Sequence, residues 1–221
     1  MKKSLLVLTF GMLVAVTSFA QFGIKAGANF ATMAEEGEGV SRDDIENRSI
    51  TGAIVGLTFE MNIADIISIQ PELLYSQSGG SNSYTLLGTT TKSKYKINYL
   101  ELPVLAKLRF GNANQEGVGF HIAAGPWIGY ALNGRFNRKT TAGETIISEV
   151  DRDYSFDDQD DAKRLNYGMI GAAGISFGHL VFDLRYNYGF NNLLDNDADN
   201  NNDNKPVLQT RGIALTLGYN F

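Results

Sequence analysis

The sequence predicts an all-β protein, an eight-stranded antiparallel up-and-down β-barrel that crosses a membrane. Three observations predict this fold class. Large apolar residues alternate with small or polar ones along most of the chain, short connections alternate with long ones, and the chain ends on an aromatic residue. A period of two is typical of a strand whose two faces meet different surroundings.

The first 20 residues are predicted to be a secretory signal peptide, so that residues 21–221 form the barrel domain. Lys2 and Lys3 supply the positive region, residues 5–16 supply the apolar core, and residues 18–20 (SFA) form a small-x-small cleavage site. The apolar run is shorter than the ~20 residues that a membrane-spanning helix needs. We therefore expect this segment to direct export across the inner membrane. A membrane-anchoring helix is the less favoured alternative.

Composition excludes several classes of protein. The chain has no cysteine, which excludes a disulfide-stapled domain, a thiolate metal site and a cysteine nucleophile. Its net charge of −5, which becomes more negative without the two leader lysines, argues against nucleic acid as a partner. The chain has 24 glycines, 10 tyrosines and 13 phenylalanines but only 4 prolines, which favours a β protein with close backbone contacts.

The alternation is clearest near the C-terminus. Leu215, Leu217, Tyr219 and Phe221 fall on one face of a strand, and small or polar residues fall on the other. Most of the segments with this pattern have about the nine to eleven residues that a tilted membrane strand needs. The predicted strands are residues 22–32, 50–61, 66–77, 94–110, 118–132, 165–177, 180–190 and 207–221.

The connections between these strands alternate in length. Short connections are predicted at residues 62–65, 111–117 and 178–179, and long loops at residues 33–49, 78–93, 133–164 and 191–206. This layout is typical of an outer-membrane barrel, whose short turns lie on the periplasmic side. A water-soluble lipocalin-like barrel with apolar faces turned inward is the alternative fold. The terminal aromatic residue, the loop lengths and the aromatic strand ends argue against it.

If the apolar faces contact lipid, the opposite faces fill the interior, and their charged members are balanced. A narrow barrel has room only for side chains, and a buried charge without a partner is costly. We therefore expect a plug of ion pairs and not an open channel, with a proton or ion path as the alternative. The basic members are Lys25, Lys107, Arg109 and Arg185, and the acidic members are Glu60, Glu72, Glu101 and Asp183.

Four segments resemble the PorT-like outer-membrane β-barrel family: residues 23–29 (GIKAGAN), 102–107 (LPVLAK), 124–130 (AGPWIGY) and 217–221 (LGYNF). The resemblance covers nearly all of residues 21–221 and implies an eight-stranded barrel of the OmpA-transmembrane type. The member that gives the family its name belongs to a protein-secretion apparatus. The resemblance also implies that Tyr219 and Phe221 are the C-terminal signal read by the barrel-assembly machinery.

Three of the long loops hold most of the acidic residues, so we expect an acidic rim outside the cell. Asp195, Asp197, Asp199 and Asp203 fall at positions 1, 3, 5 and 9 of a calcium-loop spacing. The match is incomplete, because residue 200 is Asn where the loop needs glycine and residue 206 is Pro where it needs glutamate. Calcium is the only cofactor that the sequence suggests, and divalent ions at this rim would bridge to lipopolysaccharide phosphates.

No pattern in the sequence indicates catalysis. His121 and His179 have no neighbouring serine and carboxylate in a recognisable order, and there is no phosphate-binding glycine loop or metal-binding histidine pair. We expect a monomeric, non-enzymatic outer-membrane barrel with a structural or interaction role at the cell surface, surrounded by lipid and lipopolysaccharide. The alternatives are a narrow channel or secretion-apparatus component, a membrane-embedded lipid-modifying enzyme, and a soluble ligand-binding barrel.

Overall fold

A computed structural model describes residues 20–36, 46–86, 88–111, 117–143, 145–153, 164–191 and 207–221. Nearly all of these residues lie in β-strands. In the described ranges, no helix is long and apolar enough to cross a membrane. The strands are β1 (Ala20–Glu36), β2 (Glu46–Ala64), β3 (Ile67–Leu86), β4 (Thr89–Gly111), β5 (Val118–Ala142), β6 (Thr145–Asp153), β7 (Leu165–Phe177), β8 (Leu180–Gly189) and β9 (Val207–Asn220).

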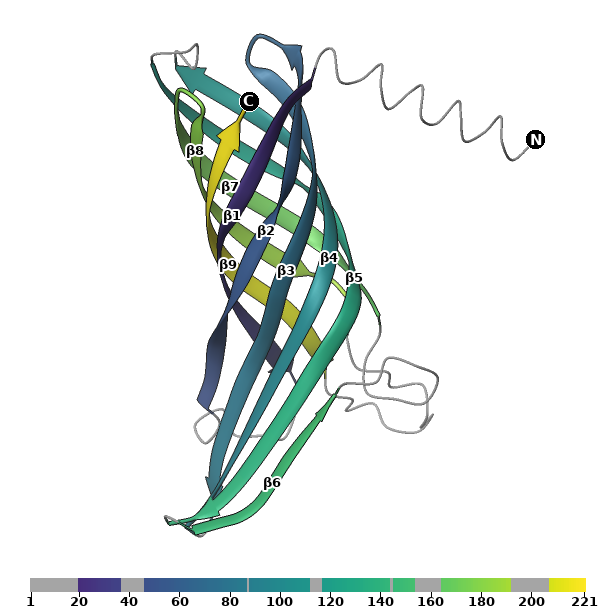
Figure 1. Ribbon diagram of the computed structural model, residues 1–221, viewed down its shortest axis with the longest axis vertical. Coiled ribbons are helices and arrows are strands. Elements are labelled where there is room, and N and C mark those ends of the chain that lie inside the picture. The colour runs from purple at the N-terminus through teal and green to yellow at the C-terminus, as the bar shows by residue number, and fades with distance from the viewer. Residues whose placement is uncertain are drawn as a thin grey trace, which may run out of the picture.

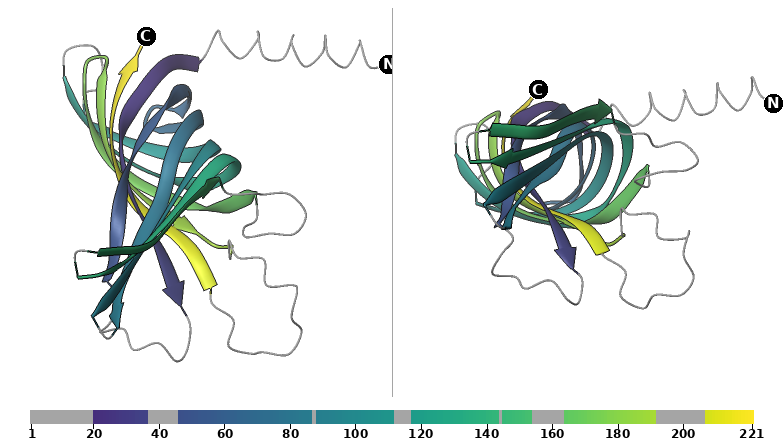
Figure 2. Two further views of the ribbon diagram at one scale, coloured as in Figure 1. Left: turned by 60° about the horizontal axis from the view of Figure 1, so that its bottom comes forward. Right: turned by 90° about the horizontal axis from the view of Figure 1, so that it is seen from below.

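Eight of these strands close into a ring, which Figure 1 shows from the side and Figure 2 from one end. Each strand is antiparallel to its neighbours in the order β1-β2-β3-β4-β5-β7-β8-β9, and the pairing of β1 with β9 closes the ring. Closure leaves no open strand edge in the barrel wall, which hydrocarbon requires because it offers backbone groups no hydrogen bonds. The predicted fold class is therefore confirmed.

The short turns lie at one end of the barrel, where β1 begins and β9 ends (Figure 1). The tightest of them joins β7 to β8 through Gly178 and His179. Gly178 has a φ of 55°, a left-handed conformation that glycine adopts without strain. Residues 1–19 of the predicted signal peptide lie outside the described residues, and its last residue, Ala20, is the first residue of β1; the signal peptide stays a prediction.

Two of the predicted loops are wrong, because strands continue through them. Within the predicted loop 78–93, residues 78–86 form the end of β3 and residues 89–93 the start of β4. Residues 133–142 extend β5 to 25 residues, and residues 145–153 form the additional strand β6, which pairs with β5 outside the ring. Burial does not alternate at the end of β3 or along β6, and polar residues occupy both faces of these segments, so the pattern that marked the other strands is absent.

These extensions form a projecting sheet made of residues 78–86, 89–98, 133–142 and 145–153, which lies beyond the barrel end opposite the termini (Figures 1 and 2). Where it joins the barrel wall, Ile97 forms a small buried core with Tyr99 and Ala131 of the wall, and Tyr95 packs against this core. The Tyr95 and Phe136 rings lie 4.9 Å apart. The projecting sheet is therefore a packed continuation of the barrel wall.

Large apolar side chains cover the outside of the ring. At ~3.3 Å per residue and a tilt of about 45°, the outward row from Leu100 to Phe110 on β4 spans about 24 Å, close to the ~25 Å apolar band of membrane barrels. Aromatic residues lie at both limits of this band. Phe22, Phe59 and Phe221 are at the termini end, with the Phe22 and Phe221 rings stacked at 5.6 Å, and Tyr130, Tyr167 and Tyr186 are toward the other end.

If the outer face contacts hydrocarbon, a charge placed at its middle destabilises the barrel. We expect Val104→Arg, in the middle of the β4 row, to lower the free energy of unfolding by about 2–4 kcal/mol. The matched control is Leu86→Arg at the tip of the projecting sheet, where we expect little change. Urea unfolding in lipid vesicles, followed by fluorescence of Trp127, the single tryptophan, measures both. Equal effects of the two substitutions would contradict this orientation.

Candidate functional site

The eight charged residues singled out in the sequence all lie on the inner face of the ring. Seven are buried, and Arg185 is among the most buried side chains, with 1% of its surface exposed. Arg109 is partly exposed, with 22% of its side chain accessible. These side chains meet because strands that are distant in sequence are brought together by ring closure.

The centre of the network joins three strands. The Lys25 ammonium on β1 lies 2.9 Å from Glu72 Oε1 on β3 and 2.6 Å from Asp183 Oδ2 on β8. The Arg185 guanidinium, also on β8, lies 2.7 Å from Glu72 Oε2. Glu101 on β4, which was predicted to take part in the network, is buried nearby but forms no ion pair within 4.0 Å among the described residues. Two cations and two carboxylates therefore bridge opposite parts of the wall.

A second group lies toward the short turns and is linked to the first. Glu60 Oε2 on β2 accepts a hydrogen bond of 2.9 Å from Lys107, and Glu60 Oε1 lies 3.5 Å from Arg109. Lys107 also donates to Gln70 Oε1 at 3.1 Å, and Gln70 Nε2 donates to Glu72 Oε1 at 2.6 Å. The amide of Gln70 thus makes one continuous network from Arg109 to the central group.

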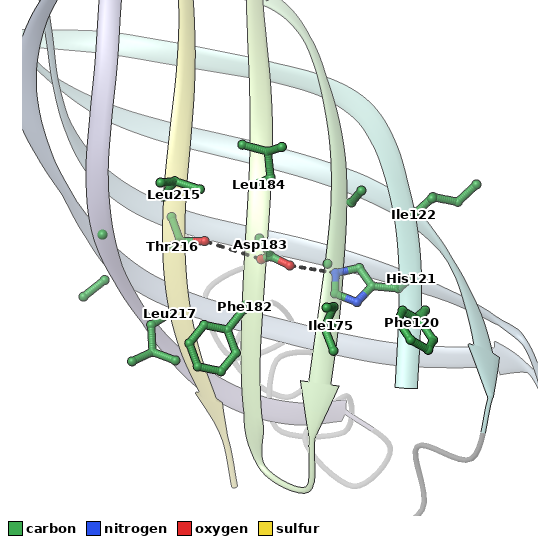
Figure 3. Close-up of a pocket in the computed structure, with 14 residues that line it drawn as sticks. Phe120, His121, Ile122, Ile175, Phe182, Asp183, Leu184, Leu215, Thr216 and Leu217 are labelled. Atoms are coloured by element: carbon green, nitrogen blue, oxygen red, sulfur yellow. Dashed lines mark hydrogen bonds and ion pairs between the residues drawn. The ribbon is translucent and has the colours of Figure 1, made fainter. Parts of the chain in front are cut away.

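His121 belongs to this network, although the sequence analysis left it out. Its Nε2 lies 2.7 Å from Asp183 Oδ1, and Thr216 Oγ1 lies 3.5 Å from Asp183 Oδ2. Figure 3 shows His121 on β5 and Thr216 on β9 on either side of Asp183. His121 falls in the same alternation as Trp127 on β5, and this signal would have placed it inside.

Gly174 makes the contact between His121 and Asp183 possible. It lies on β7, the strand between β5 and β8, directly opposite both residues in the register. A Cβ atom at this position would lie 2.4 Å from His121 Cε1 and 2.5 Å from Asp183 Oδ1. The absence of a side chain therefore lets the imidazole and the carboxylate meet across an intervening strand.

Apolar and amide side chains fill the half of the lumen nearer the projecting sheet. Leu105, Trp127 and Ile170 form a buried apolar cluster with Ala123. Asn29 donates from Nδ2 to the hydroxyls of Ser76 at 3.3 Å and Ser78 at 3.1 Å, and Asn166 donates to Thr210 at 2.9 Å. The sequence analysis expected ions inside but missed this apolar contribution.

The other predicted site residues lie elsewhere. Tyr219 and Phe221 project outward at the end of β9, with 40% and 63% of their surfaces exposed. The candidate calcium ligands Asp195, Asp197, Asp199 and Asp203 lie outside the described residues. So do most of the other residues of the predicted acidic loops, and the described part of the projecting sheet carries mainly cations.

One ion pair of the projecting sheet is bidentate. Arg135 on β5 donates from Nε and Nη2 to the two carboxylate oxygens of Asp151 on β6, both at 2.8 Å. These hydrogen bonds lower the pKa of Asp151 and raise the pKa of Arg135. Both side chains are exposed, so the pair orients β6 on β5 but contributes little to stability.

A depression with a volume of about 780 Å³ lies along the wall over β1, β5, β7, β8 and β9 (Figure 3). Its exposed lining is apolar and includes Phe120, Ile122, Phe182 and Leu184. Its polar members His121 and Asp183 keep their side chains buried inside the ring. It therefore offers a surface for hydrocarbon.

Neutralising Asp183 in the central network should destabilise the barrel, because it leaves the buried cations Lys25 and Arg185 with Glu72 as their shared ion-pair partner. We expect Asp183→Asn to lower the free energy of unfolding by about 3–5 kcal/mol. Asp151→Asn, which removes an exposed partner of Arg135, is the control and should leave unfolding almost unchanged. Denaturant titration in vesicles measures both. A wild-type midpoint for Asp183→Asn would show that the network contributes no stability.

The steric role of Gly174 is tested by a second pair of variants. We expect Gly174→Ala to destabilise the barrel by about 1–3 kcal/mol, because the added methyl group forces His121 and Asp183 apart. Gly171→Ala on the same strand has nothing within 4 Å of its new Cβ and should be neutral. The ratio of folded to unfolded bands on an unheated detergent gel at increasing urea compares them. Equal unfolding midpoints would refute the steric argument.

Comparison with known proteins agrees with this architecture. The family model described as outer membrane protein beta-barrel domain matches residues 15–195. No match was found among curated proteins. Three solved structures are similar to this chain. Neisserial surface protein A has 15% identity and a TM-score of 0.42, and the match covers 91% of this chain and 99% of that one. OprG from Pseudomonas aeruginosa has 12% identity and a TM-score of 0.47, with 91% of this chain and 96% of that one covered. The attachment invasion locus protein Ail of Yersinia pestis has 14% identity and a TM-score of 0.39, with 91% of this chain and 99% of that one covered.

The extent of the family match decides the assignment, since it covers most of the chain, from the end of the predicted leader through β8. A barrel in the outer membrane needs apolar rows on its outside and can place charged side chains inside, as this chain does. A soluble lipocalin-like barrel would have the opposite arrangement, so we set that alternative aside. The chain belongs to the outer membrane protein β-barrel domain family and resides in the outer membrane.

Proposed function

We propose that the protein is a closed, non-conducting platform that holds its projecting sheet at the cell surface for interaction with other molecules. The observation that carries this proposal is the continuous side-chain network across the lumen, from Arg109 through Glu72 to Asp183. A ring of eight strands has an interior that side chains alone fill.

The charge arrangement argues against conduction. Lys25 is shared by two carboxylates, and Glu72 is shared by two cations, so each ion is neutralised inside the wall. An ion crossing the lumen would have to break several of these contacts at once. Removing one partner from a buried pair is strongly unfavourable, so the network is a barrier and not a relay of open sites.

The projecting sheet supports the interaction part of the proposal. Short turns and termini of outer-membrane barrels lie in the periplasm, so the sheet lies outside the cell. Its tip exposes apolar side chains well beyond the apolar belt, where lipid cannot cover them. The exposed fractions are 49% for Tyr84, 66% for Leu86, 51% for Ile146 and 60% for Ile147.

We extend the proposal to membership of the PorT-like group within this family. The two most distinctive motifs lie on paired strands, with Pro103 of β4 opposite Trp127 of β5. Leu105 of the first motif packs in the same buried cluster as Trp127, and Lys107 of that motif joins the ion network. The member that gives the group its name belongs to a protein-secretion apparatus, and taking part in such an apparatus would be an interaction of the kind we propose here.

The same proposal makes the protein a monomer without enzymatic activity. Ring closure is complete within one chain. His121 is engaged with Asp183 inside the wall, and His179 Nδ1 lies 2.7 Å from the Asn220 carbonyl oxygen, beside the Tyr219 ring. Phe221, exposed next to Phe22 at the end of β9, supports recognition of this strand by the barrel-assembly machinery.

Planar-bilayer recording tests the closed lumen. We expect the purified barrel to give no stable unitary conductance, because paired side chains occupy the lumen. Asp183→Asn should also give none, since it removes a charge without removing volume. Stable unitary steps from the wild-type protein, with an ion selectivity that Asp183→Asn alters, would show conduction through the lumen and overturn the proposal.

A further inference from the structure

Five cations gather on the outer face of the projecting sheet. Lys92, Lys94 and Lys96 alternate along β4, and Arg135 and Lys139 alternate along β5. The register places Lys96 directly opposite Arg135 and Lys92 directly opposite Lys139. Side chains directly opposite each other on paired strands share a face, so the five form one patch, here called the lysine face.

Like charges in directly opposed positions repel one another. Asp151 offsets this for Arg135 through its bidentate contact. Within the residues that the structure describes, the four lysines have no carboxylate within 4.0 Å. Glu149 lies directly opposite Lys139 in the register, so the positive charge that the described residues leave without counter-charge is concentrated on Lys92, Lys94 and Lys96 of β4.

A small notch gives the lysine face a defined polar site. Lys94 and Lys96 line it together with Thr51 of β2 and Gln77 of β3, and its volume is about 40 Å³. It lies where the pairing of β2 with β3 shifts register, between Ser49 and Ile54. Two ammonium groups, a hydroxyl and an amide are donors suited to one anionic group such as a phosphate.

The height of this site matches a lipid headgroup. Leu102 and Leu100 are the last large apolar residues of the outward row on β4, Asn98 follows, and Lys96 is next. At ~3.3 Å per residue, Lys96 lies about 13 Å along the strand from Leu100, or about 9 Å along the membrane normal at a tilt of about 45°. Polar headgroup layers extend about 5–7 Å beyond the hydrocarbon on each side, so the Lys96 backbone lies just past this layer and its long side chain can reach back into it.

We propose that the lysine face binds the phosphorylated headgroup of an outer-leaflet glycolipid. The acyl chains would lie along Leu100, Leu102 and the rest of the apolar row, and a phosphate would lie at Lys94 and Lys96. Continuity between the apolar row and the cations favours a lipid over a soluble anion, which gains nothing from the row. Carboxylates on the outer face of β6 confine the headgroup to the side of β3 and β4; these are Glu149, Asp151 and Asp153.

Native mass spectrometry of the purified barrel in detergent tests this binding. The protein is titrated separately with a phosphorylated lipid A-type glycolipid, with its dephosphorylated form and with inorganic phosphate. We expect the phosphorylated lipid to bind at least about tenfold more tightly than either of the others, since each lysine near an anionic headgroup favours binding.

Matched double variants locate the site. K94Q/K96Q should lose the preference for the phosphorylated lipid, and K94R/K96R should keep it. R138Q/R152Q is the control, because Arg138 and Arg152 lie on the inner face of the same sheet, over the Phe136 ring. K92Q/K139Q tests the lysine face independently of the notch and should weaken the preference. Heat-modifiable gel migration verifies the fold of each variant.

Three outcomes would overturn the proposal. Equal binding of the dephosphorylated lipid would show that the phosphate is not recognised. Equal losses in K94Q/K96Q and R138Q/R152Q would show a nonspecific charge effect. Binding of inorganic phosphate as tight as that of the glycolipid would show a site for free anions in place of a lipid. None of these outcomes bears on conduction, so the platform function is tested separately.

Discussion

Lys25 and its two carboxylate partners hold together the centre of this molecule. Glu72 and Asp183 reach the ammonium from strands on either side of β1, although Asp183 is 158 residues away in the chain. Hydrocarbon on the outside of the wall imposes this arrangement, because charged side chains in the spanning strands must turn inward and find partners there. Ring closure, which satisfies the backbone, brings those partners within reach.

Packing and electrostatics depend on each other inside the ring. The imidazole of His121 reaches Asp183 only because Gly174, on the strand between them, has no side chain. Toward the projecting sheet, Trp127 and Ile170 fill the space that charges leave. A lumen filled in this way has little freedom to rearrange, since each ion pair is fixed by contacts from several strands.

The sequence was sufficient to predict the strands wherever the two faces differ strongly in polarity. In β8 and β9, large apolar residues alternate with polar ones, and the predicted limits lie within about one residue of the observed ones. The choice of ion partners could not be predicted, because the pairing of Lys25 with Asp183 depends on the register around a closed ring. The extension of β5 and the strand β6 were missed because outside the bilayer both faces carry polar residues.

Lysines at different heights along the membrane normal lie in different environments. Lys25 and Lys107, at the depth of the bilayer, point inward and are paired, whereas Lys94 and Lys96 point outward. The outward lysines of β4 begin beyond Asn98, and the pairing of β4 with β5 shifts register at the same place. An outward lysine is stable only where water or anionic headgroups replace hydrocarbon, so the first outward lysine on β4 indicates where the hydrocarbon ends. Below this height β4 is part of the barrel wall, and above it β4 carries the face that we propose binds a headgroup.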